Sequence, residues 1–253
     1  MTAWWGGRWL LTAALILAGL SGWCDEPDLS SYARRQYAEA REKYRSAPEN
    51  VELAWQFARA CFDRAEFATN STERALIAEE GLAACRQALE RAPASAPARY
   101  YLGMNLGQLA RTKGIGALKL VNQMEREFQT VRQEDATIDY GGPDRNLGLL
   151  YRETPIIASI GSRSKAKHHL QQAAALAPTY LDNRLNLAES YLRWGDRNGA
   201  LREWKAVEEL WEKARAEFSG EAWASTWADW SIRREQLRSQ VTTEPRSLKS
   251  PRA

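Results

Sequence analysis

The sequence has few of the side chains that form most catalytic and metal-binding sites. Its 253 residues include only two histidines and three cysteines. His168 and His169 are neighbours, so on a helix their side chains point about 100° apart and cannot share a metal ion as an i, i+4 pair can. No Cys, His and Asp spacing completes such a site, and no nucleophile has a suitable base beside it. We therefore expect both histidines on the surface, no metal site, no cofactor and no catalytic residue.

The sequence also lacks the alternating β-branched runs of strands, and it lacks a strong excess of one charge. Long stretches of Ala, Leu, Arg, Glu and Gln favour helices instead. The net charge is +3, with acidic and basic residues well mixed, whereas a nucleic-acid-binding protein usually gathers basic residues on one face. These features predict an all-α protein whose partners do not include nucleic acid.

The apolar run near the N-terminus is too short to cross a membrane comfortably. Residues 9–20 follow Arg8 and precede several small residues, which is the layout of a secretory signal peptide. We predict a signal peptide over residues 1–23 and a location in the periplasm or elsewhere in the cell envelope. A helical repeat domain is expected over residues 24–240, and a disordered basic tail over residues 241–253.

Cys24 lies next to the predicted cleavage site, where a lipid anchor could be attached. Lipoprotein processing generally requires Leu three residues before the cysteine and Gly or Ala directly before it. Those positions hold Ser21 and Trp23, so a free thiol is favoured and lipidation is the alternative. Membrane association is expected only if Cys24 is lipidated.

The other two cysteines, Cys61 and Cys85, fall on neighbouring predicted helices. If these helices are antiparallel, Cys85 lies at the level of Trp55, about six residues or ~9 Å along the axis from Cys61. A disulfide requires Cα atoms within ~7 Å of each other. We therefore favour two buried free thiols, and a Cys61–Cys85 disulfide is the alternative.

Two short motifs are better explained as helix caps than as functional sites. The segment 161–165 resembles a phosphate-binding loop but lacks its Gly-x4-Gly-Lys-Ser/Thr order and a preceding strand. Ser164 is instead predicted to cap a helix. Asn70 begins a glycosylation acceptor, which is a common chance match, and we expect Ser71 or Thr72 to cap the helix that follows.

The recurring feature of the sequence is a pattern of small, large and proline residues at fixed spacing. Ala166 and Ala173 let two helices approach closely, Leu170 fills the groove between them, and Pro178 ends the second helix. This pattern is typical of tetratricopeptide repeats, helix–turn–helix units of about 34 residues that stack into a superhelix. The same spacing recurs in Leu187, Ala188, Tyr191, Ala200, Trp204 and Val207, and more loosely in Gly81, Cys85, Ala88, Pro93, Leu102, Gly103 and Leu106.

We predict an all-α, tetratricopeptide-like superhelix of about five helix pairs, closed by a Trp-rich C-terminal helix. Trp223, Trp227 and Trp230 recur at i, i+4 and i+7, so they share one face of that helix. Trp204 and Trp211 form a similar stripe on the helix before it. Because an end repeat must cover an exposed apolar face, a cap is favoured. An aromatic wall for an apolar or sugar-like ligand is the alternative.

A long connection over residues 153–163 carries Ile156, Ile157 and Ile160. A segment with three isoleucines is not expected to lie in water. We expect it to pack back onto the helices, and lining a cavity is the alternative.

Polar residues on the first helices of the pairs are the candidate binding residues, because first helices line the inner surface of such superhelices. We expect them to contact a ligand or a partner protein. The candidates are Arg99, Asn105, Gln108, Arg145, Arg184 and Asn186.

Several segments also occur together in one family of exported helical proteins. These are residues 147–151 (Leu-Gly-Leu-Leu-Tyr), the Pro-containing insertion, the 166–178 pattern, and segments 101–103 and 105–110. Through them the chain resembles, over about residues 30–210, the T component of TRAP (tripartite ATP-independent periplasmic) transporters. The resemblance implies a helical periplasmic protein, often lipid-anchored, that forms a pore-bearing oligomer and works with a periplasmic substrate-binding protein.

These observations favour a non-enzymatic, exported scaffold that mediates protein–protein interaction in the cell envelope. The alternative is a transport accessory, like a TRAP T component, whose helical tunnel holds a small apolar or amphipathic ligand. An enzyme is the weakest of the three. A polar, Asn- and Arg-rich concave face would favour the scaffold, and a continuous apolar lining would favour the transport accessory.

Overall fold

The computed structural model describes residues 29–114, 116–155 and 159–243, and these ranges contain ten α-helices, one 3-10 helix and no strand. The all-α class is therefore confirmed. No described helix is both long enough and apolar enough to span a membrane. The predicted signal peptide and Cys24 lie outside the described residues. In chain order the helices are α1 (Leu29–Ser46), α2 (Val51–Glu66), α3 (Ser71–Arg91), α4 (Ala96–Ala110), α5 (Ala117–Glu134), α6 (Ile138–Glu153), α7 (Arg163–Leu176), α8 (Leu181–Arg193), α9 (Arg197–Glu217), η1 (Glu221–Trp223) and α10 (Ala224–Thr242).

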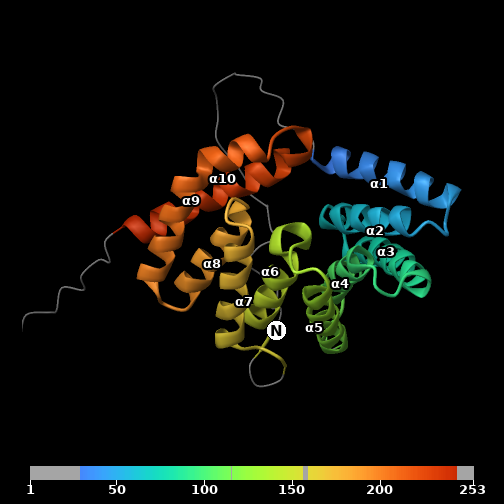
Figure 1. Cartoon of the computed structure of the whole chain (residues 1–253), viewed down its shortest axis with the longest axis horizontal. Helices are drawn as coiled ribbons and strands as arrows, with labels where there is room; N and C mark the ends of the chain where they lie inside the picture. The colour runs from blue at the N-terminus through green and yellow to red at the C-terminus, as the bar shows by residue number, and fades with distance from the viewer. Residues whose placement is uncertain (1–28, 115, 156–158, 244–253) are drawn as a thin grey trace, which may run out of the picture.

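Consecutive helices form four packed pairs, α2–α3, α4–α5, α6–α7 and α8–α9. The first helices also contact one another, α2 with α4, α4 with α6 and α6 with α8, so they form a continuous row. At the two ends, α1 packs on α2, and α10 packs on α8 and α9. The array curves until the start of α1 lies near the η1–α10 end (Figure 1). This arrangement is the predicted tetratricopeptide-like superhelix, with four complete pairs and one additional helix at each end.

Small residues occupy the helix contacts, as the repeat pattern predicts. Ala173 is fully buried, and a Cβ atom added to Gly148 would lie 2.6 Å from Cγ of Leu170. A Cβ at Gly81 would likewise meet the side chain of Asn105 at 2.6 Å. Helices this close leave no room for a larger side chain, so the spacing of the small residues sets how the pairs stack.

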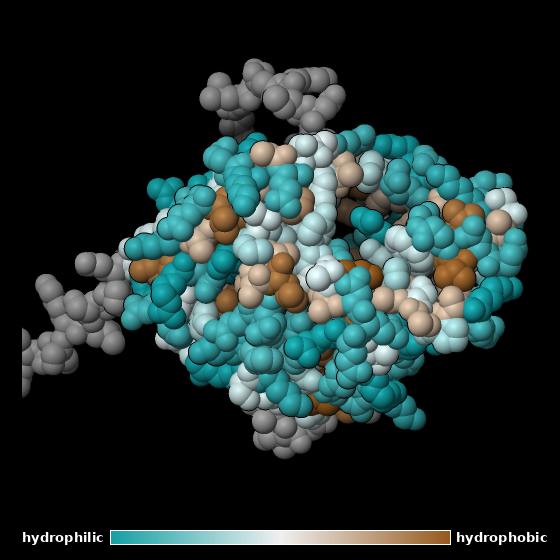
Figure 2. Space-filling view, in the orientation of Figure 1, coloured by the Kyte–Doolittle hydropathy of each residue, from teal (hydrophilic) through white to brown (hydrophobic). Residues whose placement is uncertain are grey.

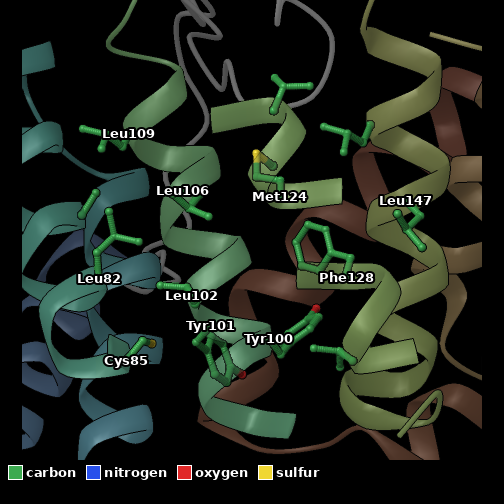
Figure 3. Close-up of a cluster of buried hydrophobic side chains, with 14 of the residues drawn as sticks. Leu82, Cys85, Tyr100, Tyr101, Leu102, Leu106, Leu109, Met124, Phe128 and Leu147 are labelled. Atoms are coloured by element: carbon green, nitrogen blue, oxygen red, sulfur yellow. The ribbon is translucent and has the colours of Figure 1, made fainter. Parts of the chain in front are cut away.

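The largest apolar cluster joins neighbouring pairs into one core. Leu82 of α3, Leu106 of α4, Phe128 of α5 and Leu147 of α6 are all buried in it (Figure 3). Because each repeat buries its apolar face against the next, no pair is stable alone. Cys85 lies in the same cluster, and Cys85 and Cys61 are both buried and free, which confirms that they form no disulfide.

Two helix caps differ from the prediction by one or two residues. Helix α3 begins at Ser71, and Asn70 is its cap because Asn70 Oδ1 accepts a hydrogen bond from the Glu73 backbone N–H at 2.9 Å. Helix α7 is capped by Ser162, whose Oγ accepts from the Lys165 N–H, so the prediction of Ser164 is wrong. In both cases the extended residue directly before the helix makes the bond.

Helix α10 covers the open end of the array with tryptophan, which confirms the predicted cap. Trp230 is 1% exposed and packs against Tyr180 and Phe218 at centroid distances of 5.3 and 5.9 Å. Trp227 is half-buried, meets Trp211 edge-on at 5.2 Å, and donates a hydrogen bond to the Phe218 carbonyl.

The boundaries of the cap differ from the prediction. Trp223 lies in η1 and not on the final helix. Helix α10 continues to Thr242, two residues into the predicted tail. Its end is held because Val241 is buried in an apolar cluster that includes Ala200 of α9. The rest of the tail, residues 244–253, lies outside the described residues.

Replacing Trp230 with alanine is expected to lower the free energy of unfolding by about 3–5 kcal/mol, because it leaves a cavity at the most buried ring of the cap. Trp227→Ala should lower the free energy of unfolding by less, because Trp227 is only half-buried. Exposed His168, replaced by alanine, is the control and should change stability by less than about 0.5 kcal/mol. Denaturant melts measure all three, and an unchanged midpoint for Trp230→Ala would rule out the cap.

Candidate functional site

The row of first helices faces a hollow in the molecule. Figure 2 shows the surface hollowed between the α1–α2 side and the α6–α10 side. A polar network on the inner helices joins α4, α6, α8 and α10. Its geometry depends on one unusual piece of backbone and on two buried arginines.

The unusual backbone is the corner at the start of α6. Asp139, Tyr140 and Gly141 are consecutive left-handed residues, with φ of 49°, 57° and 78°. The left-handed conformation costs roughly 1–2 kcal/mol for each residue that carries a Cβ atom. Only Gly141 adopts it without that cost. The corner therefore stores strain that the surrounding contacts must offset, and Pro143 then starts the regular part of the helix.

Arg145 holds this corner in place. Its Nη1 donates to the carbonyl oxygens of Asp139 at 3.0 Å and Tyr140 at 3.4 Å, and to Asn183 Oδ1 at 3.1 Å. Its Nη2 pairs with the Asp139 carboxylate, and its Nε lies 3.4 Å from Asp182. Burial by itself lowers the pKa of Arg145, but the neighbouring carboxylates outweigh that effect and raise it. The guanidinium is thus buried, charged and fully partnered.

A second buried arginine, Arg233 of α10, joins the same network. It pairs with Asp182 at 2.5 Å and Glu189 at 2.6 Å, and it donates to Asn186 Oδ1 at 2.8 Å. Although burial lowers the pKa of Arg233, these carboxylates hold it well above the usual range. Since Asp182 contacts both Arg145 and Arg233, one carboxylate of α8 ties α6 to α10.

The six predicted binding residues all have partners within the chain, and the structure brings two of them together. Arg145 and Asn186 belong to the network around Asp182. Among the other four, Asn105 donates to the carbonyl oxygens of Ala58 and Tyr101, Gln108 donates to Glu66, Arg99 pairs with Glu127 and Arg184 with Glu203. These four tie adjacent helices to one another at separate places along the array.

The residues that remain available in the hollow were not singled out from the sequence. Asp63 of α2 has a side chain that is 52% exposed, 4.0 Å from Arg59. Protein surrounds its carboxyl on several sides, and this desolvation raises the pKa of Asp63 to about 6. Arg59 opposes the shift, and the nearby carboxylates of Asp139 and Glu66 add to it. The α6 corner therefore lies near enough to α2 for Asp139 and Asp63 to interact electrostatically. The only sign of this ion pair in the sequence is the i, i+4 spacing of Arg59 and Asp63.

An aromatic group packs around the α6 corner. Tyr140 is 39% exposed and stacks on Tyr180 at 4.7 Å with nearly parallel rings. Phe218 and Trp223 meet the Tyr140 ring at a steep angle, at 5.2 and 5.9 Å. The strained corner therefore presents one aromatic face toward solvent beside the carboxylates. Such a surface suits a polypeptide segment that carries both apolar and polar side chains.

His169 differs from the prediction of a surface histidine. Its Nδ1 lies 2.6 Å from Oδ1 of Asp144, a buried carboxylate that also accepts a hydrogen bond from Arg132. Neighbouring His168 is exposed, as predicted. The difference arises because the helix phase turns His169 toward α6. No group of three or more metal-binding side chains occurs in the described parts of the chain.

The connection after α6 is held at its ends. Ser162 N–H donates to the Tyr151 carbonyl at 2.9 Å, and Gly161 N–H donates to the Pro155 carbonyl at 3.2 Å. Ile160 packs against the main core, in agreement with a packed insertion. Ile156 and Ile157 lie outside the described residues.

Two solved structures are similar in fold to this chain. The thermophilic tetratricopeptide-repeat (TPR) protein TTC0263 of Thermus thermophilus has a TM-score of 0.59 at 20% identity, with 82% of this chain and 93% of that chain covered. MamA has a TM-score of 0.50 at 16% identity, with 74% of this chain and 96% of that chain covered. Residues 25–125 match the family described as RMD1-3, regulator of microtubule dynamics protein 1-3. The curated proteins contain no significant match.

These comparisons establish a shared helical-repeat fold. The family match covers less than half of the chain, so it does not assign the chain to that family. The resemblance to the T component of TRAP transporters is not supported by them.

Replacing Gly141 with alanine is expected to lower the free energy of unfolding by at least about 1–2 kcal/mol. The new Cβ would be held at a left-handed φ of 78°, 3.3 Å from the Ala173 backbone. Gly116 is the matched control, because its φ is −64° and the nearest atom to an added Cβ is 3.9 Å away. Gly116→Ala should change stability by less than about 0.5 kcal/mol. Equal stability of the two variants would contradict the strained corner.

Proposed function

We propose that this protein is a non-enzymatic scaffold that binds a segment of a partner protein in the hollow. The observation that carries the proposal is the division of polar groups on the inner face. Arg145 and Asn186 are bonded to other groups of the chain, whereas the half-exposed Asp63 carboxylate and the exposed Tyr140 ring remain accessible. A partner segment can contact these groups without breaking the network that holds the helices together.

The character of the hollow favours a protein segment over a small apolar ligand. A continuous apolar lining would suit the transport accessory, but α2 and the α6 corner carry charged groups that are at least partly exposed, among them Arg59, Asp63 and Asp139. TPR proteins, whose fold this chain shares, generally bind protein partners.

We also propose that the scaffold acts in the cell envelope after export. The support is the short apolar run behind Arg8, followed by small residues, in residues 1–23. A periplasmic substrate-binding protein, as in TRAP systems, is one candidate partner. Membrane association depends on lipidation of Cys24.

Reversing the charge of Asp63 tests the partner site. Asp63→Arg places a bulky cation in the hollow, and we expect proteins that co-purify with the wild type from envelope extract to be depleted at least tenfold, which corresponds to about 1.4 kcal/mol. Glu79→Arg, an exposed change on the outer helix α3, is the matched control and should retain them. Quantitative mass spectrometry compares the three samples, and the same partners at the same level in all three would refute the site.

Export is tested by the mass of the mature protein. Protein isolated from the envelope should lack residues 1–23, and intact-mass spectrometry reads this directly. A further mass increase of a lipid, together with partitioning into membranes, would identify Cys24 as acylated. Recovery of the chain with Met1 in place would contradict the signal peptide.

A further inference from the structure

One exposed ion pair connects the two ends of the superhelix. Arg35 of α1 lies 3.4 Å from Glu221 of η1, although 186 positions separate them in the sequence. Their side chains are 57% and 73% exposed. Figure 1 shows why they meet, since the curvature of the array brings the start of α1 to the η1–α10 end. The helices therefore close into a ring beside the hollow.

The rest of α1 is fixed to the array far more firmly than its start. Tyr37 and Arg41 both bond to Glu80 of α3, Arg41 at 3.1 Å, and Tyr44 bonds to Gln87. The rings of Tyr37 and Tyr44 also pack against Phe57 of α2, at 5.7 and 5.3 Å. These contacts hold α1 from Tyr37 onward.

The two turns before Tyr37 have weaker anchors. Ala33 is the one buried residue of α1, and its small side chain buries little apolar surface. The first turn carries no acidic residue to favour the positive end of the helix dipole. An exposed ion pair favours the closed form by about fivefold at most. The start of α1 is therefore expected to leave η1 often enough to populate an open ring.

Closure of the ring restricts what can enter the hollow. A closed ring admits only a free chain end, whereas an internal segment of a folded partner requires a side opening. The start of α1 is the part of the ring that can move without disturbing the network of Arg145 and Arg233, because α1 packs on α2 and has no part in that network.

We propose that the first two turns of α1 are a gate beside the hollow and that the Arg35–Glu221 ion pair is its latch. The gate opens by unwinding of these two turns, while the anchored segment that begins at Tyr37 stays in place. Its opening is controlled by charge, because salt at about 1 M shortens the Debye length to about 3 Å and screens an exposed pair. The inference concerns the ring itself and does not depend on which partner the hollow binds.

Distance measurements between two spin labels test the gate. Labels at Arg34→Cys in the gate and Ala222→Cys in η1 replace exposed residues next to the latch. Cys24 is replaced by serine, and Cys61 and Cys85 are buried, so we expect neither to be labelled. A second label pair, Glu42→Cys with Ala222→Cys, reports on the anchored part of α1 as the control.

Pulsed electron–electron double resonance should show a population of gate pairs at a short distance at about 0.1 M salt. A second population at a longer distance should grow at about 1 M salt. Glu221→Arg should produce the long population at low salt, and the exchanged variant Arg35→Glu/Glu221→Arg should restore the short one. The control pair should not change. The latch would be overturned if the gate distance changed neither with salt nor in Glu221→Arg. It would also be overturned if the exchanged variant kept the long distance. A change in the control distance would show that α1 also moves beyond Tyr37 and would contradict the anchored segment.

Discussion

The architecture of the inner face depends on keeping two buried guanidinium groups paired. Removing a charge from water is costly unless opposite charges and hydrogen bonds replace the water. Arg145 and Arg233 meet this requirement by sharing Asp182 and by adding Asp139 and Glu189. This sharing fixes the relative positions of α6, α8 and α10, and it also holds the strained corner at the start of α6.

The position of that corner determines what the hollow presents. With Asp139 and Tyr140 held in left-handed conformations, the corner holds a carboxylate and a partly exposed aromatic ring at fixed positions. Tyr100 of α4 donates to the Asp139 carboxylate at 2.5 Å, so the corner is held from both neighbouring pairs. A flexible loop at this place would not keep these groups at a fixed separation. The proposed partner site therefore follows from the buried network beside it.

The sequence predicted the stacking of the helices well, because the signal for it is local. Ala166, Leu170 and Ala173 reveal a helix contact through spacing alone, and all three are fully buried. The polar residues were harder to assign. Asn105 and Arg145 occupy first helices as expected, but whether a polar side chain there faces a partner or bonds to the next helix depends on tertiary contacts.

Other features could not be read from spacing, for physical reasons that differ. Asp139 and Tyr140 have no intrinsic preference for left-handed φ, and contacts from Tyr100, Arg145 and Asn183 stabilise it. His169 contacts Asp144 of the preceding helix, whereas its neighbour His168 points about 100° away. Which of the two is buried depends on the exact rotation of the helix about its axis. Asp63 interacts electrostatically with Asp139 only because the tertiary fold brings α2 near the α6 corner.

The stability of an Arg145→Met variant tests the central claim most directly. Methionine keeps much of the length and apolar surface of the side chain but removes the guanidinium, which leaves Asp139 and Asp182 without that partner. The account predicts that equilibrium denaturation will show a loss of about 3–5 kcal/mol in the free energy of unfolding. Arg202→Met, at an exposed position of α9, is the control for loss of an arginine. An Arg145→Met variant as stable as the wild type would contradict the account, because the inner face would then not depend on the buried charge.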